Sequence, residues 1–376
     1  MKRFLIVAGE FSGEIYGARL MREIRALRPD ATFAGIGGDR MKAEGLEVFR
    51  HCKEMAVIGL SQMLGRLGFL LGAMDELKEK IRSRAFDAVI LIDYAGFNFR
   101  MARTAKECGI PVFYYVLPQI WVWRKYRMRA MKKYVDAALS VLPFEPEFYE
   151  SRGGKATFVG HPMVDEISFP SDPSATKKGF LSAGCDTLVG LMPGSRAGEI
   201  RDMLATLVKV TDIIRAKKPN VGFVMPVVQH ADLEFIRSVV GGRDFIKITT
   251  DGSHPVMAVA DLLIAKSGTT ALEAALFGVP LVVAYKTRWL SYWAARPFVH
   301  LKFAALPNLI MGREVAREFL QANFTAEKVG EYALDLLSNP GRLAEARKEI
   351  GRAREKLGEK GAAKRAAEII VNRLSK

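Results

Sequence analysis

Short apolar runs alternate with amphipathic stretches along most of the 376-residue chain. The first apolar run, 4–8, is followed by a turn containing glycine and serine and then by a helix-like stretch to about residue 27. Runs of this length are typical of buried strands, and the spacing after them is typical of helices. This alternation predicts an α/β protein in which a parallel sheet carries helices on both faces.

The strand, turn and helix pattern starts a second time near the middle of the chain. After the first unit, strand-like runs follow at 32–37, 88–92, 112–116 and 137–141. The second start is the run 187–192, and later runs lie at 222–226, 245–248, 261–265 and 281–284. We therefore predict two Rossmann-like domains, 1–168 and 169–340, with a ligand cleft between them at the carboxyl ends of their strands.

The chain between and after these domains has its own patterns. Residues 169–176 are rich in proline and serine, and they are expected to form a linker. Apolar residues recur at helical spacing in 341–376, which predicts C-terminal helices that pack back toward the N-terminal domain.

The amino-acid composition indicates the class of protein but does not identify its binding partner. A hydrophobic fraction of 49% and a charged fraction of 26% favour a folded chain. The formal charge of +15 predicts an anionic partner, which is nucleic acid, an acidic membrane face or a phosphorylated substrate. The 3 cysteines lie far apart without a Cys-x-x-Cys pattern, so we expect no disulfide framework, no zinc site and a reducing cytoplasm.

The stretch 261–280 combines a buried strand with a loop that starts a helix. Ser267, Gly268 and Thr269 have the chemistry of a helix N-terminus, where free N–H groups and the helix dipole favour phosphate. Glu273, one turn later, is placed to accept hydrogen bonds from a ribose diol. The stretch predicts a nucleotide-sugar pocket, and the alternative is an ordinary strand-loop-helix corner with Glu273 as a solvated charge.

A second glycine and serine loop follows the strand at 187–192. The backbone of Gly194 and Ser195 and the guanidinium of Arg196 are of the types that hold and neutralise a diphosphate. The alternative is a surface arginine beside a helix cap.

Two acids follow apolar strands in the first half. Asp93 comes at the end of the run 88–92, and Glu10 comes after the run 4–8. A carboxylate at such a strand end can act as a general base whose pKa is set by burial and neighbours. Either residue could instead cap a helix or form a turn.

The stretch from 55 to 74 has one charged residue, but its glycines and polar residues argue against a membrane-spanning helix. Its apolar residues, including Met63, Leu64, Leu67 and Leu71, share a helical face that packs on the core or lies in lipid. Aromatic and basic residues alternate in two further stretches, 121–134 and 286–296. The first of them contains Arg124, Lys125 and Arg127. Such stretches suit lipid headgroups or single-stranded nucleic acid.

Several of these segments, taken in order from Val7 to about Phe319, resemble the lipid-A-disaccharide synthase family of glycosyltransferases. The likeness rests on Ala8-Gly9-Glu10-x-Ser12-Gly13, Gly37-Gly38-x-x-Met41, Asp93-x-x-Gly96-Phe97-Asn98, Pro118-x-x-Trp121-x-Trp123, Leu142-Pro143-Phe144-Glu145, Gly160-His161-Pro162-Met163, Pro193-Gly194-Ser195-Arg196, Ser267-Gly268-Thr269-x-Ala271-Leu272-Glu273 and Leu306-Pro307-Asn308-Leu309. Ala95 and Leu117 depart from the family pattern, which has proline and serine there.

The resemblance implies the GT-B fold, in which two Rossmann-like domains face each other across a cleft. It implies an inverting transfer from UDP-2,3-diacylglucosamine to 2,3-diacylglucosamine 1-phosphate (lipid X) in lipid A biosynthesis, with UDP as the second product and no cofactor or metal. The enzyme would bind peripherally to the anionic cytoplasmic face of the inner membrane. The acceptor would lie on the first domain and the donor mainly on the second.

The resemblance also implies roles for single residues. Asp93 matches the presumed base, with Glu10 as its competitor, and Glu273 matches the ribose-binding acid. Arg196 and Asn308 match residues needed for activity. The rival interpretations are a UDP-sugar epimerase or peptidoglycan glycosyltransferase of the same fold, and a nucleic-acid-binding protein. The sequence leaves the oligomeric state open.

Overall fold

The computed structural model describes residues 2–55, 67–122, 125–229, 231–286 and 302–375. The chain forms two compact units. The first contains Met1–Asp165 together with Leu357–Lys376, and the second contains Glu166–Lys356. The chain therefore leaves the first unit once and returns to it near its end.

The first unit is built on a parallel sheet with the strand order β3-β2-β1-β4-β5-β6-β7 among the described residues. Its elements are β1 (Lys2–Ala8), α1 (Phe11–Leu27), β2 (Ala31–Gly37), α2 (Asp39–Ala43), β3 (Leu46–His51), α3 (Cys52–Met55), α5 (Leu67–Arg82), β4 (Ala88–Ile92), α6 (Ala95–Glu107), β5 (Val112–Tyr115), η1 (Lys125–Arg127), α7 (Met128–Tyr134), β6 (Ala137–Ser140), α8 (Glu145–Glu150), β7 (Thr157–Phe158), η2 (Pro162–Glu166) and α18 (Ala362–Leu374). The central strand β4 is buried along its whole length, as expected for a parallel strand covered on both faces.

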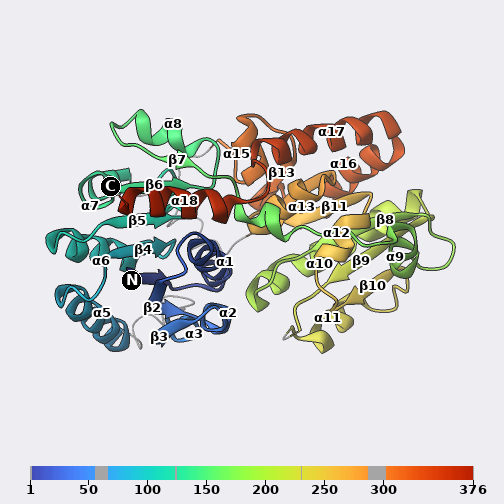
Figure 1. Cartoon of the computed structure of the whole chain (residues 1–376). Coiled ribbons are helices and arrows are strands. Elements are labelled where there is room, and N and C mark those ends of the chain that lie inside the picture. Colours follow the sequence, from blue (N-terminus) through green and yellow to red (C-terminus); the bar gives the residue numbers. More distant parts are fainter. Residues whose placement is uncertain (1, 56–66, 123–124, 230, 287–301, 376) are drawn as a thin grey trace. The chain divides into compact units, whose positions relative to one another are not determined.

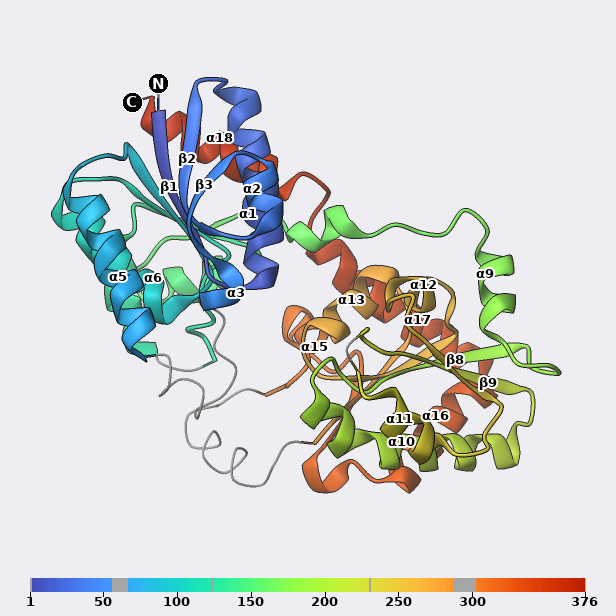
Figure 2. The same ribbon diagram turned by 90° about the horizontal axis from the view of Figure 1, so that it is seen from below.

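Helices cover both faces of this sheet. Helix α1 packs against α18, and α5 packs against α6, which in turn contacts α7. Figure 2 shows α1 and α5 on opposite sides of the strands. The strand order reverses direction between β1 and β4, so the carboxyl ends of these two strands form the switch point where open α/β sheets bind ligands.

The second unit repeats the plan with the strand order β10-β9-β8-β11-β12-β13 (Figure 1). Its elements are α9 (Pro173–Phe180), β8 (Thr187–Met192), α10 (Ala197–Lys217), β9 (Val221–Pro226), α11 (Leu233–Val240), β10 (Ile246–Thr249), α12 (His254–Val259), β11 (Leu262–Lys266), α13 (Thr269–Phe277), β12 (Leu281–Tyr285), α15 (Leu306–Met311), β13 (Arg317–Leu320), η3 (Gln321–Asn323), α16 (Ala326–Ser338) and α17 (Pro340–Lys356). Helix α10 packs with α11 and α16, whereas α13 packs with α12, α15 and α17. Its switch point lies between β8 and β11.

Two sequence-based expectations change at the borders of the units. The C-terminal helices from 341 were expected to pack back toward the N-terminal domain, but only α18 packs on α1, whereas α17 packs on α13 and α15. The expected linker 169–176 also contains the start of α9, whose first turn is capped by Asp172 through the N–H of Ala175. An aspartate followed by proline is a strong helix start, which the proline and serine content obscured.

Candidate active site

Two acidic residues meet at the switch point of the first sheet. Ala8 of β1 is paired with Ile92 of β4, and Glu10 and Asp93 follow these strand ends directly. Burial and, after it, the charge of Glu10 raise the pKa of the Asp93 carboxyl. The structure therefore brings together the two acids that the sequence offered as competing bases.

The backbone at Asp93 is held in a rare conformation. Asp93 and Tyr94 have φ angles of 46° and 45°, in the left-handed region that costs roughly 1–2 kcal/mol for a residue with a side chain. The carbonyl oxygen of Asp93 accepts hydrogen bonds from Nδ2 of Asn98 at 2.7 Å and from the hydroxyl of Tyr114 at 2.5 Å. Strain that is held in place by such partners is common at functional sites.

The Asp93 side chain does not have the capping role that was its alternative explanation. The N-cap residue of α6 is Tyr94, and no side chain caps this helix. Burial of Asp93, followed by the charge of Glu10, raises the pKa of the Asp93 carboxyl to about 6, although the backbone N–H of Tyr94 opposes the shift. At neutral pH Asp93 is mostly ionised and binds a proton more strongly than an ordinary aspartate.

Asp93 opens into a cavity of about 270 Å³, which we name the Asp93 cavity. It is lined by Asp93, Ala95, Pro118, Gln119, Ile120 and Arg127. The Tyr94 ring packs against the backbone of Gly9, where a Cβ atom would lie only 2.5 Å from the ring. Leu117, one of the departures from the family pattern, is 3% exposed and packs in the hydrophobic core.

The wall of this cavity is tied to a buried acid that sequence reasoning did not select. Nε1 of Trp121 donates to Oε1 of Glu145 at 3.2 Å, and the N–H of Leu142 donates to Oε2 at 3.3 Å. Trp121 follows directly after the cavity-lining residues 118–120. The tryptophan and the glutamate were both visible in family motifs, but only the fold shows that they are bonded to each other.

The switch point of the second sheet carries a cavity of about 550 Å³, which we name the donor cavity. Its lining includes Gly194 and Ser195 after β8 and Thr269 and Glu273 of α13. The remaining lining residues are Met192, Pro226, Val227, Val228, Gln229, Thr250, Gly252, Ser253 and Thr270. Four residues predicted to bind the donor are thus brought together by pairing of β8 with β11.

Glu273 is oriented by a histidine that the sequence analysis missed. Nε2 of His254 lies 3.7 Å from Oε1 of Glu273, and the imidazole ring packs on Phe277 with the ring centroids 5.2 Å apart. The neighbouring Glu273 carboxylate raises the pKa of His254. Glu273 thus lines the donor cavity with a histidine beside it.

The loop at 193–196 is organised by Glu199. Oε2 of Glu199 accepts from the backbone N–H of Ser195 at 3.3 Å and from that of Arg196 at 3.4 Å. Nζ of Lys266 and Nη1 of Arg196 contact Oε1 of the same carboxylate at 2.7 Å and 3.2 Å. Burial alone would raise the pKa of Glu199, but these cations outweigh it and the pKa is lowered.

This arrangement changes the expectation for the loop. Two amides next to the predicted diphosphate site, those of Ser195 and Arg196, donate to Glu199 in the structure. The guanidinium of Arg196 is exposed. Gly194 has a φ of 120°, and a Cβ there would lie 2.5 Å from the Glu199 carboxylate, so this position requires glycine.

Asn308 lies in the interior of the second unit, with 0% of its surface exposed. Its Oδ1 accepts from the N–H groups of Val315 and Ala316, and its Nδ2 donates to the carbonyl of Ala316 and to Glu318. The same Glu318 accepts from the N–H groups of Ala304 and Ala305. All hydrogen-bonding capacity of the Asn308 amide is used to hold this loop.

The loop held by Asn308 reaches the strand end predicted to bind phosphate. Oγ of Ser267 donates to the carbonyl of Ala304 at 2.8 Å. Gly268 is the N-cap residue of α13, with a φ of 128°. Asn308 therefore supports the loop around Ser267 from behind, through Glu318 and Ala304.

The predicted membrane-facing residues are only partly within the described part of the chain. Met63, Leu64, Arg124 and the side chain of Leu67 lie outside the described residues. Leu71 on α5 is 48% exposed, and its neighbour Phe69 is 38% exposed. The next turns of α5 point the other way, since Ala73, Met74 and Leu77 belong to the core. Lys125 is exposed and Arg127 lies over the Phe99 ring at 5.5 Å.

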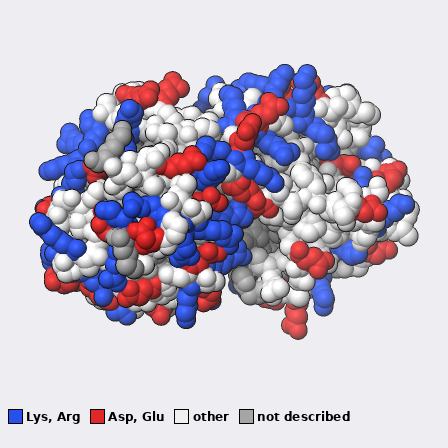
Figure 3. Space-filling model, in the orientation of Figure 1, with Lys and Arg blue, Asp and Glu red and all other residues white. Residues whose placement is uncertain are grey.

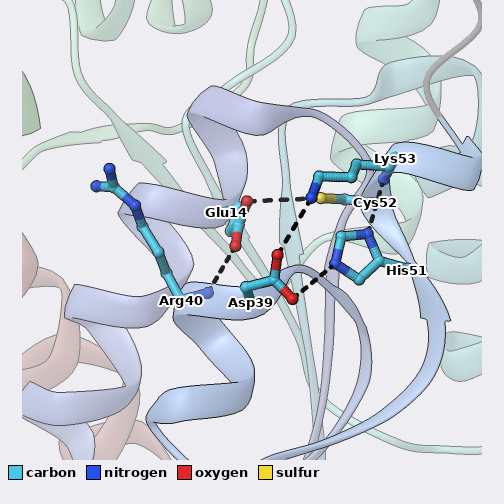
Figure 4. Close-up of polar contacts among 6 residues, drawn as sticks. All are labelled: Glu14, Asp39, Arg40, His51, Cys52 and Lys53. Carbon is cyan, nitrogen blue, oxygen red and sulfur yellow. Dashed lines mark hydrogen bonds and ion pairs between the residues drawn. The ribbon is translucent and has the colours of Figure 1, made fainter.

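A cluster of polar residues near α1 proves to be structural (Figure 4). Oε1 of the buried Glu14 accepts from the backbone N–H of Arg40 at 2.7 Å, and Cys52 donates to Oε2 at 3.6 Å. Asp39 contacts His51 and Lys53 at 3.3 Å and 3.2 Å. These bonds fasten α2 and α3 to α1. In the described part of the chain no group of three or more such side chains is placed to hold a metal ion.

A family model described as lipid-A-disaccharide synthetase matches residues 4–372. The chain belongs to this family. Lipid-A-disaccharide synthases from Myxococcus xanthus and Nitrosococcus oceani are each 38% identical, over 99% and 97% of this chain and 97% and 95% of their own lengths. Membership confirms the resemblance and makes the chain a glycosyltransferase of lipid A biosynthesis.

Solved structures support the fold. A putative UDP-N-acetylglucosamine 2-epimerase from Listeria monocytogenes has a TM-score of 0.66 and 15% identity, covering 100% of this chain and 96% of its own. MurG from Acinetobacter baumannii has a TM-score of 0.63 and 13% identity, covering 99% and 100%. At this identity they bear on the fold alone, and they confirm the prediction of two Rossmann-like sheets of the GT-B type.

Among the described residues, no helix has both the length and the apolar character needed to cross a membrane. Figure 3 shows Lys and Arg side chains interspersed with Asp and Glu over the face of each unit that it displays. The excess of positive charge is therefore spread over that face, and local arrangements of cations have to be found residue by residue.

Proposed function

We propose that this chain transfers the sugar of UDP-2,3-diacylglucosamine to 2,3-diacylglucosamine 1-phosphate (lipid X) and forms the β-1,6-linked lipid A disaccharide 1-phosphate. Family membership over residues 4–372 is the observation that carries the proposal. The acceptor 6-hydroxyl oxygen bonds to C1 of the donor as the bond from C1 to the diphosphate breaks. The hydroxyl proton passes to a base, and UDP leaves with the bonding electron pair. This balance needs no cofactor.

Asp93 is the base in this proposal. Burial and the charge of Glu10 raise the pKa of its carboxylate to about 6. The carboxylate lines a cavity of about 270 Å³, where the acceptor hydroxyl would lie. Glu10 is exposed and acts on Asp93 through its charge. We assign the proton transfer to Asp93 and a supporting electrostatic role to Glu10, because a base works best when its pKa lies near the working pH.

The donor nucleotide is assigned to the second unit. Glu273 in the donor cavity would accept hydrogen bonds from the ribose hydroxyls, and the start of α13 at Gly268 and Thr269 would face the diphosphate. Arg196 would exchange its surface ion pair with Glu199 for the diphosphate. Such an exchange is inexpensive, since exposed ion pairs contribute about 0–1 kcal/mol. Asn308 supports this site without contacting the nucleotide.

We further propose that the protein binds peripherally to the cytoplasmic face of the inner membrane, from which its acylated substrates come. The exposed Phe69 and Leu71 of α5 and the basic residues of η1 support this placement. Aromatic and basic side chains together favour the headgroup zone of an anionic bilayer. Nucleic acid is not expected as a partner, and oligomers remain compatible with the sequence.

The experiment that tests the function is a mass-spectrometric assay with both purified substrates. The expected products are the disaccharide 1-phosphate and UDP in equal amounts, with none from Asp93→Asn protein. An epimerase would convert the UDP-sugar without the acceptor, and a nucleic-acid-binding protein would bind oligonucleotides with a steep salt dependence and gain no stability from UDP. Absence of disaccharide from protein that still binds UDP would overturn the proposal.

A further inference from the structure

A second cavity of the first unit lies between α6 and the segment formed by η1 and α7. It has a volume of about 480 Å³ and is rich in basic and aromatic side chains, and we name it the basic cavity. Its lining consists of Ala95, Gly96, Phe99 and Arg100 from α6, Tyr126 and Arg127 from η1, and Arg129, Ala130, Lys133 and Tyr134 from α7.

The cations of the basic cavity have no acidic partners. Within the described part of the chain, no carboxylate forms an ion pair with Arg100, Arg127, Arg129 or Lys133. Arg100 donates to the carbonyl of Gly96 at 2.8 Å, and Lys133 lies over the Tyr134 ring at 5.4 Å. Like charges gathered around one hollow repel each other, and a bound anion removes that repulsion.

Other cations on the same helix behave differently. Arg103 of α6 pairs with Glu107 at 2.8 Å, and Lys106 pairs with Asp136. These two residues do not line the basic cavity. On α6, the cation that lines the cavity has no acidic partner, whereas the two cations outside it are paired. On α7, Lys132 lies outside the cavity and donates to the carbonyl of Arg152.

The basic cavity adjoins the Asp93 cavity. Ala95 and Arg127 line both of them. A sugar whose reacting hydroxyl lies beside Asp93 can therefore extend a neighbouring substituent past Arg127 into the basic cavity. In the acceptor of the proposed reaction, the 6-hydroxymethyl group and the 1-phosphate are carried by the two carbons that flank the ring oxygen, so both groups can reach adjoining cavities.

We propose that the basic cavity binds the phosphomonoester of the acceptor sugar, with Arg100, Arg127 and Lys133 as its ligands. Guanidinium groups bind phosphate through two parallel hydrogen bonds, and the Phe99, Tyr126 and Tyr134 rings supply faces for the sugar and its first acyl carbons. The inference rests on the proposed function for the identity of the acceptor. It adds the group by which the acceptor is recognised.

The test replaces two cations that do not line the Asp93 cavity, Arg100→Gln and Lys133→Gln, in one protein. A matched control carries Arg103→Gln and Lys132→Gln, which remove the same two charges from the same two helices outside the basic cavity. Transfer is measured in neutral detergent micelles with the 1-phosphate acceptor and with the same diacylglucosamine lacking phosphate. Binding of glucosamine 1-phosphate is measured separately by broadening of its ³¹P resonance.

The cavity variant should raise KM for the phosphorylated acceptor by roughly tenfold to a hundredfold, the usual effect of losing charge-assisted hydrogen bonds. Its kcat should change little, and its kinetics with the acceptor lacking phosphate should equal those of the parent. The control should behave like the parent with both acceptors. An unchanged KM, or an equal loss with both acceptors, overturns the proposal.

Vesicle flotation separates the acceptor from the alternative source of lipid phosphate. If the cavity variant loses binding to vesicles containing phosphatidylglycerol but keeps its KM in micelles, the cavity serves bilayer headgroups and the proposal is wrong. The ³¹P measurement tests the basic cavity independently of the proposed function. If only the cavity variant loses binding of glucosamine 1-phosphate, the phosphate site is supported even if the parent makes no disaccharide. If the cavity variant transfers the sugar with an unchanged KM, the phosphate site is wrong but the proposed function stands.

Discussion

Nε1 of Trp121 lies 3.2 Å from Oε1 of Glu145, a carboxyl group that is 1% exposed. Burial raises the pKa of Glu145 to about 8, although its bonds to the Leu142 N–H and to Trp121 act in the opposite direction. The pair fixes the end of the segment 118–121, which forms the wall of the Asp93 cavity. Glu145 is therefore a positioning residue for the candidate base.

The raised pKa of Glu145 predicts a pH-dependent stability. Its pKa rises from an ordinary 4.5 to about 8 on folding, so its contribution to stability is fully present below pH 4.5 and is lost as the pH rises through 8. Glu145→Gln cannot ionise and should melt at a more constant temperature between pH 5 and 8. Calorimetry at both pH values measures this, with the exposed Glu147→Gln as control. Identical pH dependence in parent and Glu145→Gln would contradict it.

The two acids at the first switch point predict a shift in the pH dependence of catalysis. Activity of the parent should rise with pH through about 6, as Asp93 loses its proton. Glu10→Gln removes a charge that raises this pKa, so the rise should move to lower pH. Asp93→Asn should lose nearly all transfer and keep UDP binding. If Glu10→Gln abolishes transfer at every pH while Asp93→Asn retains it, Glu10 is the base.

Arg196 is predicted to act in catalysis without contributing to stability. Among the described residues its side chain pairs only with Glu199, which keeps Lys266 as a second cationic partner. Because the Arg196 side chain is itself 68% exposed, Arg196→Ala should melt nearly like the parent. Loss of a group that stabilises the leaving diphosphate costs roughly a hundredfold to a thousandfold in rate. Arg201→Ala is the control, because Arg201 lies on the same helix and pairs with Asp232 at 3.9 Å. Near-normal turnover of Arg196→Ala would refute the assignment.

Asn308 is predicted to show the opposite behaviour. Asn308→Ala leaves the part-buried N–H of Val315, the buried N–H of Ala316 and the Glu318 carboxylate without this partner. A buried neutral group that loses its partner costs about 1–3 kcal/mol. We expect a clear fall in melting temperature together with weaker UDP binding. Thermal melts with and without UDP measure both effects. A variant that melts like the parent but no longer binds UDP would mean that Asn308 contacts the nucleotide directly.

Helix α5 offers a matched pair for the membrane proposal. Leu71 is 48% exposed, whereas Leu77 is 0% exposed and lies in the core. Leu71→Ser should leave the melting temperature almost unchanged and weaken flotation with anionic vesicles. Leu77→Ser should lower the melting temperature strongly, since truncating a buried leucine costs about 2–5 kcal/mol. Should Leu71→Ser float as well as the parent, this part of α5 does not bind lipid.

The central strands could be predicted from the sequence, and some outer strands could not. Strands such as β4 and β11 are continuous apolar runs because both of their faces are buried. Strands β3 and β7 are the two edges of the first sheet, and β13 is an edge of the second. Their residues are partly exposed, so no apolar run marks them, and β7 has only 2 residues.

The candidate site divides in the same way between local and distant relationships. Asp93 and the 193–196 loop follow strands directly, and Glu273 lies on the helix that comes after β11. Their positions are visible in short stretches of sequence. The bond between Lys266 and Glu199 joins residues 67 positions apart. The same Glu199 carboxylate accepts a hydrogen bond from the backbone N–H of Ser195 in the loop. The family resemblance implies that Asn308 is needed for activity, but no local pattern marks it as buried. Contacts of this kind depend on packing of distant segments.

The return of the chain to the first unit sets an order for folding during synthesis. Helix α18 packs on α1, although α18 follows the whole second unit in chain order and is therefore synthesised much later than α1. The backbone of Leu357 and Gly361 bonds to His161 and Asp165 at the point of return. The second unit, complete at residue 356, can therefore fold before the first unit is closed. Until α18 has been synthesised, the face of α1 that it will cover remains open to solvent and to chaperones.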